Sequence, residues 1–141
     1  MGDLTAHFDL AEFASRDGAP FPDDVSLETL TRTATMLEAL REGLAEEIGH
    51  TAPVIILSGY RSPAHNAAVG GVPGSYHMKG MAADVVCQSA IPSVVQRVAL
   101  RLQARGIIGG VGKYAGFTHV DIGPQRTWDE TTKAARGGAV A

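Results

Sequence analysis

The feature that most constrains the fold is a long amphipathic segment near the N-terminus. Apolar residues recur at intervals of three and four from Leu27 to Ile48, which lays one stripe along about six turns of helix. Ser26 stands where a helix cap is expected, and Gly49 stands where the helix should end. A helix over residues 27–48 with one apolar face needs a surface to pack against, which the rest of the chain has to supply.

Downstream of this helix, short strands and helices follow one another without a regular alternation. Strands are predicted at residues 54–57, 81–87, 110–114 and 117–122, with a tight turn at 115–116 between the last two. Further helices are predicted just after Asp9 and at 63–69 and 92–105, and a glycine-rich loop at 70–80. The predicted class is therefore α+β, with a small, mainly antiparallel sheet packed against helices.

Length, charge and cysteine content limit the number of domains, the possible binding partners and the possible disulfides. With 141 residues, 45% of them hydrophobic, the chain is expected to form one domain over residues 1–128, followed by a flexible tail at 129–141. Its formal charge of −3 offers no basic face to nucleic acid, and its apolar runs are shorter than the roughly 20 residues that span a bilayer. Cys87 is the only cysteine, so we expect a buried thiol without a disulfide. We expect a monomer that binds neither nucleic acid nor membrane.

Four polar residues lie where their side chains need partners. Asp84 falls in an apolar strand, where an unpaired carboxylate is costly, so it needs a cation. His77 lies seven residues earlier, at the edge of the glycine-rich loop, and the turn at Lys79-Gly80 could bring the two side chains together. His119 and Asp121 share one face of a later strand. Two imidazoles and one carboxylate are the ligand set of a catalytic zinc site, beside which Asp121 would handle a proton.

Two other interpretations of these residues stay open from spacing alone. In the first, each is satisfied locally: His77 in a loop, Asp84 by backbone amides, and His119 on a solvated strand face. In the second, His119 and Asp121 with another histidine form the two-histidine, one-carboxylate set of iron oxygenases. That motif takes its last histidine from downstream, and no histidine follows Asp121.

Longer motifs surround the same residues. They are SGYRSP at 58–63, SYHMKGMAAD at 75–84, GGVG at 109–112 and FTHVDIG at 117–123. Together they resemble the M15 zinc peptidases, the D-alanyl-D-alanine carboxypeptidases and peptidoglycan endopeptidases that share a fold with the hedgehog signalling domain. The opening HFDLAEF at 7–13 is similar to phage-associated members, and HVDIGPQRTW at 119–128 to the murein endopeptidase branch. The resemblance covers almost the whole chain.

The resemblance implies a function and a site. It implies that His77, Asp84 and His119 bind Zn²⁺ and that Arg61 contacts a substrate carbonyl or carboxylate. The implied substrate is peptidoglycan, cut at an amide bond that involves a D-amino acid, by an endolysin-like endopeptidase or a D,D-carboxypeptidase. The N-terminus lacks the basic and then apolar pattern of a secretory signal, so such an enzyme would stay in the cell until released or would be phage-associated.

One position departs from the family pattern. Several branches have Glu or Asp three residues before the last zinc-binding histidine, where this chain has Gly116. Asp121 is therefore our candidate for the general base, and its alternative role is to orient His119. The departure also leaves room for a non-catalytic, zinc-containing cell-wall-binding module of the same fold.

Other histidines and aromatic residues are expected to have structural roles. These are His7, His50, His65, Tyr60, Tyr76 and Tyr114. Arg126 and Trp128 lie in the resembling segment and are expected to close the sheet or to form a wall of the substrate site.

Overall fold

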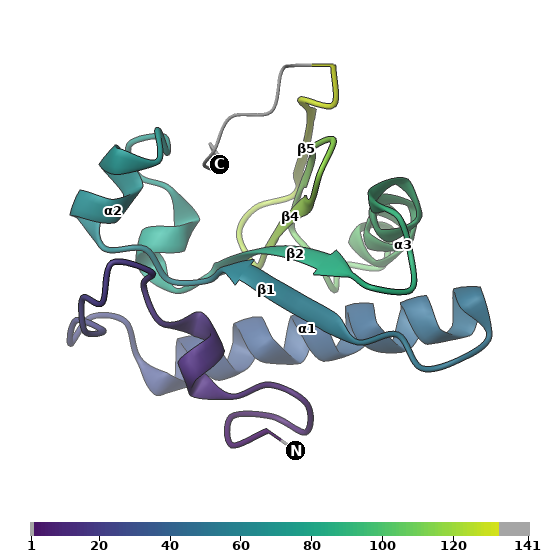
Figure 1. Ribbon diagram of the computed structural model, residues 1–141, viewed down its shortest axis with the longest axis horizontal. Coiled ribbons are helices and arrows are strands. Elements are labelled where there is room, and N and C mark those ends of the chain that lie inside the picture. The colour runs from purple at the N-terminus through teal and green to yellow at the C-terminus, as the bar shows by residue number, and fades with distance from the viewer. Residues whose placement is uncertain (1, 133–141) are drawn as a thin grey trace.

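The long helix predicted from the apolar stripe is present with the expected bounds. The computed structural model describes residues 2–132, and in it α1 spans Leu27–Ile48. The Ser26 hydroxyl accepts a hydrogen bond from the Thr29 amide at 3.1 Å, and Gly49 ends the helix with a φ of 83°, which glycine adopts without strain. The apolar stripe is buried, and α1 runs beneath the sheet (Figure 1).

Within residues 2–132, five strands form one sheet in the order β1-β2-β4-β3-β5. They are β1 (Val54–Ser58), β2 (Ala82–Cys87), β3 (Gly110–Lys113), β4 (Thr118–Asp121) and β5 (Arg126–Asp129). Neighbouring strands are antiparallel except β3 and β5, which run parallel. The predicted α+β class, with a mainly antiparallel sheet packed against helices, is confirmed.

The smaller helices connect these strands. They are η1 (Leu10–Phe13), α2 (Pro63–Ala68), η2 (Tyr76–Lys79) and α3 (Pro92–Ala104). α3 packs against α1 and against β2, β3 and β4, and the buried apolar side chains of both helices and the sheet form one cluster. The core therefore lies between the helices and one face of the sheet.

Two elements were not expected from the sequence. The 3-10 helix η2 lies in the segment predicted to be a loop, and β5 adds a strand where no strand was predicted. The amide of Glu130 donates to the carbonyl of Lys113 at 2.7 Å, so the chain is still bonded to β3 where the tail was predicted to begin. Residues 133–141 of that tail lie outside the described residues, and the domain limits stay a prediction.

The two faces of the sheet differ in chemistry. Val85 and Val120 point to the helices and are buried in the core. Because successive side chains of a strand point to opposite faces, Asp84, His119 and Asp121 share the other face. The functional residues predicted on these strands are therefore separated from the core by the sheet itself.

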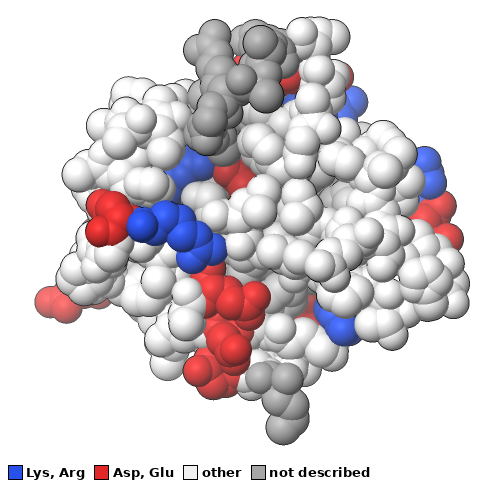
Figure 2. Space-filling model, viewed as in Figure 1, with Lys and Arg blue, Asp and Glu red and all other residues white. Residues whose placement is uncertain are grey.

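The surface carries charges of both signs among uncharged side chains on the face shown in Figure 2. Cys87 is buried and its thiol is free, as predicted. Over residues 2–132, no helix combines the length and the hydrophobicity needed to cross a membrane.

Candidate metal centre

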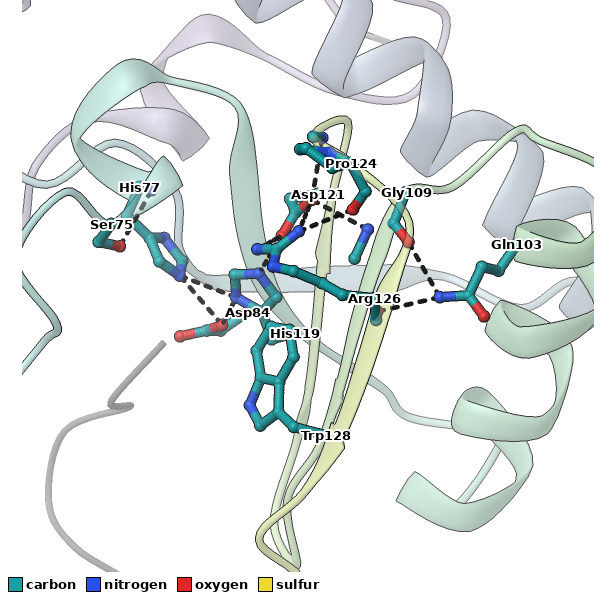
Figure 3. A network of polar contacts seen from close by, with 12 residues as sticks. Ser75, His77, Asp84, Gln103, Gly109, His119, Asp121, Pro124, Arg126 and Trp128 are labelled. Atoms are coloured by element: carbon teal, nitrogen blue, oxygen red, sulfur yellow. Dashed lines mark hydrogen bonds and ion pairs between the residues drawn. The ribbon is translucent and has the colours of Figure 1, made fainter.

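Three ligand atoms from three elements meet on the polar face of the sheet (Figure 3). His77 comes from η2, Asp84 from β2 and His119 from β4. Oδ1 of Asp84 lies 3.2 Å from Nε2 of His77 and 3.1 Å from Nδ1 of His119, and the two nitrogens are 3.2 Å apart. All three side chains are buried. The structure brings together the residues that the sequence predicted to bind a metal.

Strand register and one capped turn position these three side chains. Asp84 and His119 are direct partners in the antiparallel β2–β4 pair, so their side chains are neighbours on one face. The hydroxyl of Ser75 accepts a hydrogen bond from the His77 amide at 3.2 Å and starts η2. Gly80, with a φ of 71°, ends η2 and directs the chain into β2. The short helix thus holds His77 next to the strand pair.

Hydrogen bonds on the outer sides of the two imidazole rings set their tautomers. Nδ1 of His77 lies 2.8 Å from the carbonyl oxygen of Gly59, which can only accept, so Nδ1 carries a proton. Nε2 of His119 lies 2.7 Å from Oδ2 of Asp121 and donates to that carboxylate. In the neutral rings, Nε2 of His77 and Nδ1 of His119 then present lone pairs to the cluster.

The third ligand is held by an arginine. Oδ2 of Asp84 accepts a hydrogen bond from Nη2 of Arg61 at 2.9 Å, which leaves Oδ1 to face the imidazoles. Arg61 also donates to Oγ of Ser58 at 3.1 Å and to Oδ1 of Asn66 at 3.2 Å, and its side chain is only 1% exposed. Arg61 therefore lies behind Asp84, inside the protein, and its contact with substrate stays a prediction.

Asp121 shares the face of His119, as the strand pattern predicted, but its carboxylate contacts the far nitrogen of the ring. Oδ1 accepts hydrogen bonds from the amides of Gly110 and Gly123, each at 2.9 Å. Nη2 of Arg126 donates to Oδ2 at 2.8 Å, and Asp121 is fully buried. This arrangement matches the alternative role, the orientation of His119, and differs from a base beside the ligand atoms.

Burial and charge act in opposite directions on the ionisation of the three ligands. Burial lowers the pKa of His77 and keeps its ring neutral. Burial opposes ionisation of Asp84, but His77 and His119 hold the pKa of that carboxyl below its usual value. Burial also disfavours a charged His119, yet its hydrogen bonds to Asp121 and Asp84 raise the pKa of the ring. The cluster therefore favours a positive charge at its centre.

A metal ion would supply that charge. Two nitrogen lone pairs and a carboxylate oxygen within 3.2 Å of one another repel unless a proton or a metal cation lies among them. Two imidazoles and one carboxylate are ligand types that zinc binds in catalytic sites. The outer hydrogen bonds of all three groups match those that orient metal ligands in known sites. The residues present thus fit a zinc ion held by His77, Asp84 and His119.

Glycines on β3 leave room for side chains of β5 to reach the centre. Gly112 pairs with His119 on one side and with Trp128 on the other, and a Cβ at Gly112 would lie 2.5 Å from the indole. Because that Cβ is absent, the Trp128 ring lies over β3 with its centroid 5.0 Å from the His119 ring. Its Nε1 donates to the hydroxyl of Tyr114 at 3.0 Å. Trp128 therefore forms a wall beside a metal ligand.

Gly110, two residues before Gly112 on β3, also leaves room for side chains of the neighbouring strands. Gly110 pairs with Asp121 and with Arg126, and a Cβ there would collide with both side chains. The GGVG motif at 109–112, which resembles a family signature, contains both of these glycines. Two glycines two residues apart in a predicted strand share a face of that strand. This spacing was the signal that one face of β3 has no side chains and leaves room for those of its neighbours.

The remaining histidines lie in other contacts. His7 pairs with Glu38 at 2.7 Å, and Nδ1 of His50 lies 3.0 Å from the carbonyl oxygen of Thr51. His65 lies on α2 and is not part of the cluster of His, Asp, Glu and Cys side chains found within residues 2–132.

Comparison with known proteins agrees with the motifs. A family model described as Peptidase M15 matches residues 6–121. The peptidoglycan L,D-endopeptidase MepK of Escherichia coli K12 is 33% identical over 109 residues, which cover 67% of this chain and 58% of that protein. The probable peptidoglycan L,D-endopeptidase MepK of Haemophilus influenzae is 38% identical over 84 residues, 55% of this chain and 43% of that protein. The chain thus spans between two fifths and three fifths of the length of these curated relatives.

The family match covers most of the chain and contains the whole cluster. His77, Asp84 and His119 all fall between residues 6 and 121. The resemblance drawn from the motifs is confirmed, and the chain belongs to the peptidase M15 family.

Proposed function

We propose that this chain is a zinc-dependent peptidase that hydrolyses amide bonds involving D-amino acids in the stem peptides or cross-links of peptidoglycan. The observation that carries the proposal is the convergence of one lone-pair atom each from His77, Asp84 and His119, whose outer atoms are all hydrogen-bonded. Membership of a peptidase family supports the reaction type. The names of the MepK relatives support peptidoglycan as the substrate.

The chain's own residues prepare this site for a metal. When bound, zinc polarises a substrate carbonyl as a Lewis acid and lowers the pKa of water. Arg61 holds Asp84, and Asp121 holds His119, so both ligands are oriented before a metal arrives. Loss of such outer contacts typically weakens metal affinity or activity by about 10- to 100-fold. We assign both residues positioning roles, in place of the substrate contact and the general base expected from the sequence.

Metal analysis tests the site. The purified protein is expected to hold about one zinc per chain, as a single three-ligand site requires. The double variant His77→Ala, His119→Ala should bind none. Undiminished zinc in the double variant would exclude this cluster as the site, and iron in place of zinc in the native protein would favour the oxygenase interpretation.

Digestion of purified peptidoglycan tests the reaction. Mass spectrometry of the muropeptides identifies the bond from the mass lost and the new termini: loss of a terminal residue shows a carboxypeptidase, and a split cross-link or stem shows an endopeptidase. The zinc-free double variant is the control. A zinc-loaded protein that sediments with cell walls and releases no new termini would instead be the non-catalytic binding module.

A further inference from the structure

Beside the metal centre, one arginine contacts two aromatic rings. The guanidinium carbon of Arg126 is 4.8 Å from the ring centroid of Tyr76 and 5.2 Å from that of Trp128. Arg126 and Trp128 are two residues apart on β5, so both project to the face that carries His119 (Figure 3). Cation–π contacts with two rings restrict the orientation of a side chain that otherwise rotates freely.

Part of this guanidinium is already bonded. Nη1 donates to Oδ1 of Asp121 at 3.2 Å and to the carbonyl of Pro124 at 2.9 Å, and Nη2 donates to Oδ2 of Asp121 at 2.8 Å. A guanidinium has five N–H groups, and these bonds use three of them. The Nε–H and the second Nη2–H have no acceptor among residues 2–132, and the side chain of Arg126 is 37% exposed.

The two remaining N–H groups lie on one edge of the guanidinium plane. Nε–H and the adjacent Nη2–H point the same way and form a fork, which matches the two oxygens of a carboxylate. The adjacent fork, formed by Nη1 and Nη2, already binds the carboxylate of Asp121. Arg126 can therefore bind a second carboxylate without releasing the first.

Support of Asp121 alone does not account for this arginine. The carboxylate of Asp121 also accepts hydrogen bonds from His119 and from the amides of Gly110 and Gly123. It is thus satisfied and held in place by three other donors. Support of Asp121 therefore does not explain why the Arg126 guanidinium is partly exposed and contacts two aromatic rings.

A second cation lies on the same rim. Nζ of Lys79 lies 5.0 Å from the ring centroid of Tyr76, the ring that also contacts Arg126. Lys79 is exposed and makes no ion pair with any residue in the described range. In contrast, the carboxylates of Asp84 and Asp121 are both buried and paired with arginines. Arg126 and Lys79 therefore place two partly or fully exposed cations against the Tyr76 ring.

We infer that Arg126 is a specificity-determining residue that binds a carboxylate of the substrate peptide close to the scissile amide, so that the preferred substrates are anionic peptides. This inference rests on the proposed peptidase function. It assigns the open fork of Arg126 to the substrate, with Trp128 and Tyr76 as the walls that keep the fork oriented. Lys79 adds attraction for the same negative charge.

The test compares two synthetic stem peptides that differ in one group. One carries a free carboxylate on the residue next to the scissile amide, and the other carries a carboxamide there. The zinc-loaded native protein should prefer the carboxylate peptide by about 10- to 100-fold in kcat/KM, the range expected for a charged hydrogen-bonded pair. Arg126→Gln should abolish the preference by raising KM for the carboxylate peptide alone. Arg126→Lys keeps the charge without the fork and should lose most of the preference.

Two controls separate recognition from structure. Arg101→Gln removes an exposed arginine that pairs with Glu47 on the far helices, and it should leave both peptides unaffected. Zinc affinity, measured by chelator competition, should stay within about threefold of native in Arg126→Gln, because Asp121 keeps its other donors. Equal losses for both peptides together with weakened zinc would show that Arg126 only positions Asp121, and would overturn the inference.

Failure of the proposed function leads to a different result. If the native protein cleaves both peptides equally well, the peptidase function holds and the inference is wrong. If it cleaves neither, the peptidase function is wrong, and calorimetric binding of the two peptides to the zinc-loaded protein decides the inference. A preference for the carboxylate peptide that disappears in Arg126→Gln would support it, and equal binding would overturn it.

Discussion

His119 and Asp121 are joined through the ring nitrogen that points away from the other two ligands. Nε2 of His119 lies 2.7 Å from Oδ2 of Asp121, whereas Nδ1 of the same ring lies 3.1 Å from Oδ1 of Asp84. The imidazole therefore stands between the Asp121 carboxylate and the proposed zinc position. Any effect of Asp121 on the metal passes through the orientation and the basicity of His119.

Asp121→Asn is expected to weaken zinc binding by about 10- to 100-fold, because a neutral amide no longer favours the proton on Nε2 of His119. Activity at saturating zinc should recover most of the native rate. Competition with a chromogenic chelator gives the affinity, and turnover is measured on the same preparation over a range of zinc concentrations.

Asp129→Asn is the matched control for this variant. Asp129 lies on β5 and pairs with Lys113 at 3.6 Å, with its side chain 53% exposed. Zinc affinity should be unchanged in this control. If Asp121→Asn kept native zinc affinity and lost about a hundredfold or more in rate, Asp121 would be the general base after all.

Arg61→Ala is expected to destabilise the metal-free protein by about 3–5 kcal/mol, because it leaves the buried carboxylate of Asp84 without its charged partner. Urea unfolding in the presence of a chelator measures this free energy. Zinc should restore part of the stability, since it binds only the folded chain.

Arg97→Ala provides the comparison for Arg61. Arg97 is 57% exposed and pairs with Glu47, so its loss should cost less than about 1 kcal/mol. If Arg61→Ala kept native stability but lost most of its activity, the result would favour the direct contact of Arg61 with substrate that the family resemblance implies.

Gly112→Ala is expected to displace the Trp128 ring and to destabilise the protein by about 1–3 kcal/mol, as overpacking does. The added Cβ would lie 2.5 Å from the indole, which has to move away from His119. Trp128 is the only tryptophan, so its fluorescence emission reports the movement directly. In the control Gly116→Ala, the Cβ meets nothing within 4 Å, and emission and stability should stay native. Unchanged emission in Gly112→Ala would refute the steric argument.

Acid is expected to weaken the attachment of the N-terminal segment to α2. The hydroxyls of Ser15 and Ser62 donate to Asp17 and lower the pKa of its carboxyl from 3.8 to about 2. Because the folded-state pKa is the lower one, this stabilisation is complete only well above the ordinary pKa of 3.8, and it is lost as the pH falls through the folded-state pKa of about 2.

Asp17→Asn should therefore flatten the pH dependence of the free energy of unfolding between pH 4 and 2, measured by urea titration at each pH. Asp23→Asn removes the same formal charge at an exposed position and serves as the control. An identical pH profile in Asp17→Asn and the native protein would show that the two serine contacts do not contribute.

Much of the site was predictable from the sequence because the demand for a partner was local. The Asp84 carboxylate lies in an apolar strand, so it requires a cation in any arrangement of the rest of the chain. The alternation of His119 and Asp121 along one strand places them on one face in any sheet. Which nitrogen of His119 faces Asp121 was not predictable, because the Asp121 carboxylate is held by the amides of Gly110 and Gly123, which strand pairing and a turn bring there.

The sequence by itself determined the elements whose signals lie within one stretch of chain: the apolar stripe and caps of α1, the buried strand β2 and the strand β4. Only the tertiary structure decided the parallel pairing of β3 with β5, the burial of Arg61 behind Asp84 and the clamp around Arg126. Hydrophobic period and capping depend on residues a few positions apart, so a single segment carries them. Contacts between side chains distant in sequence depend on register and on the space that missing side chains leave, and no local pattern contains either.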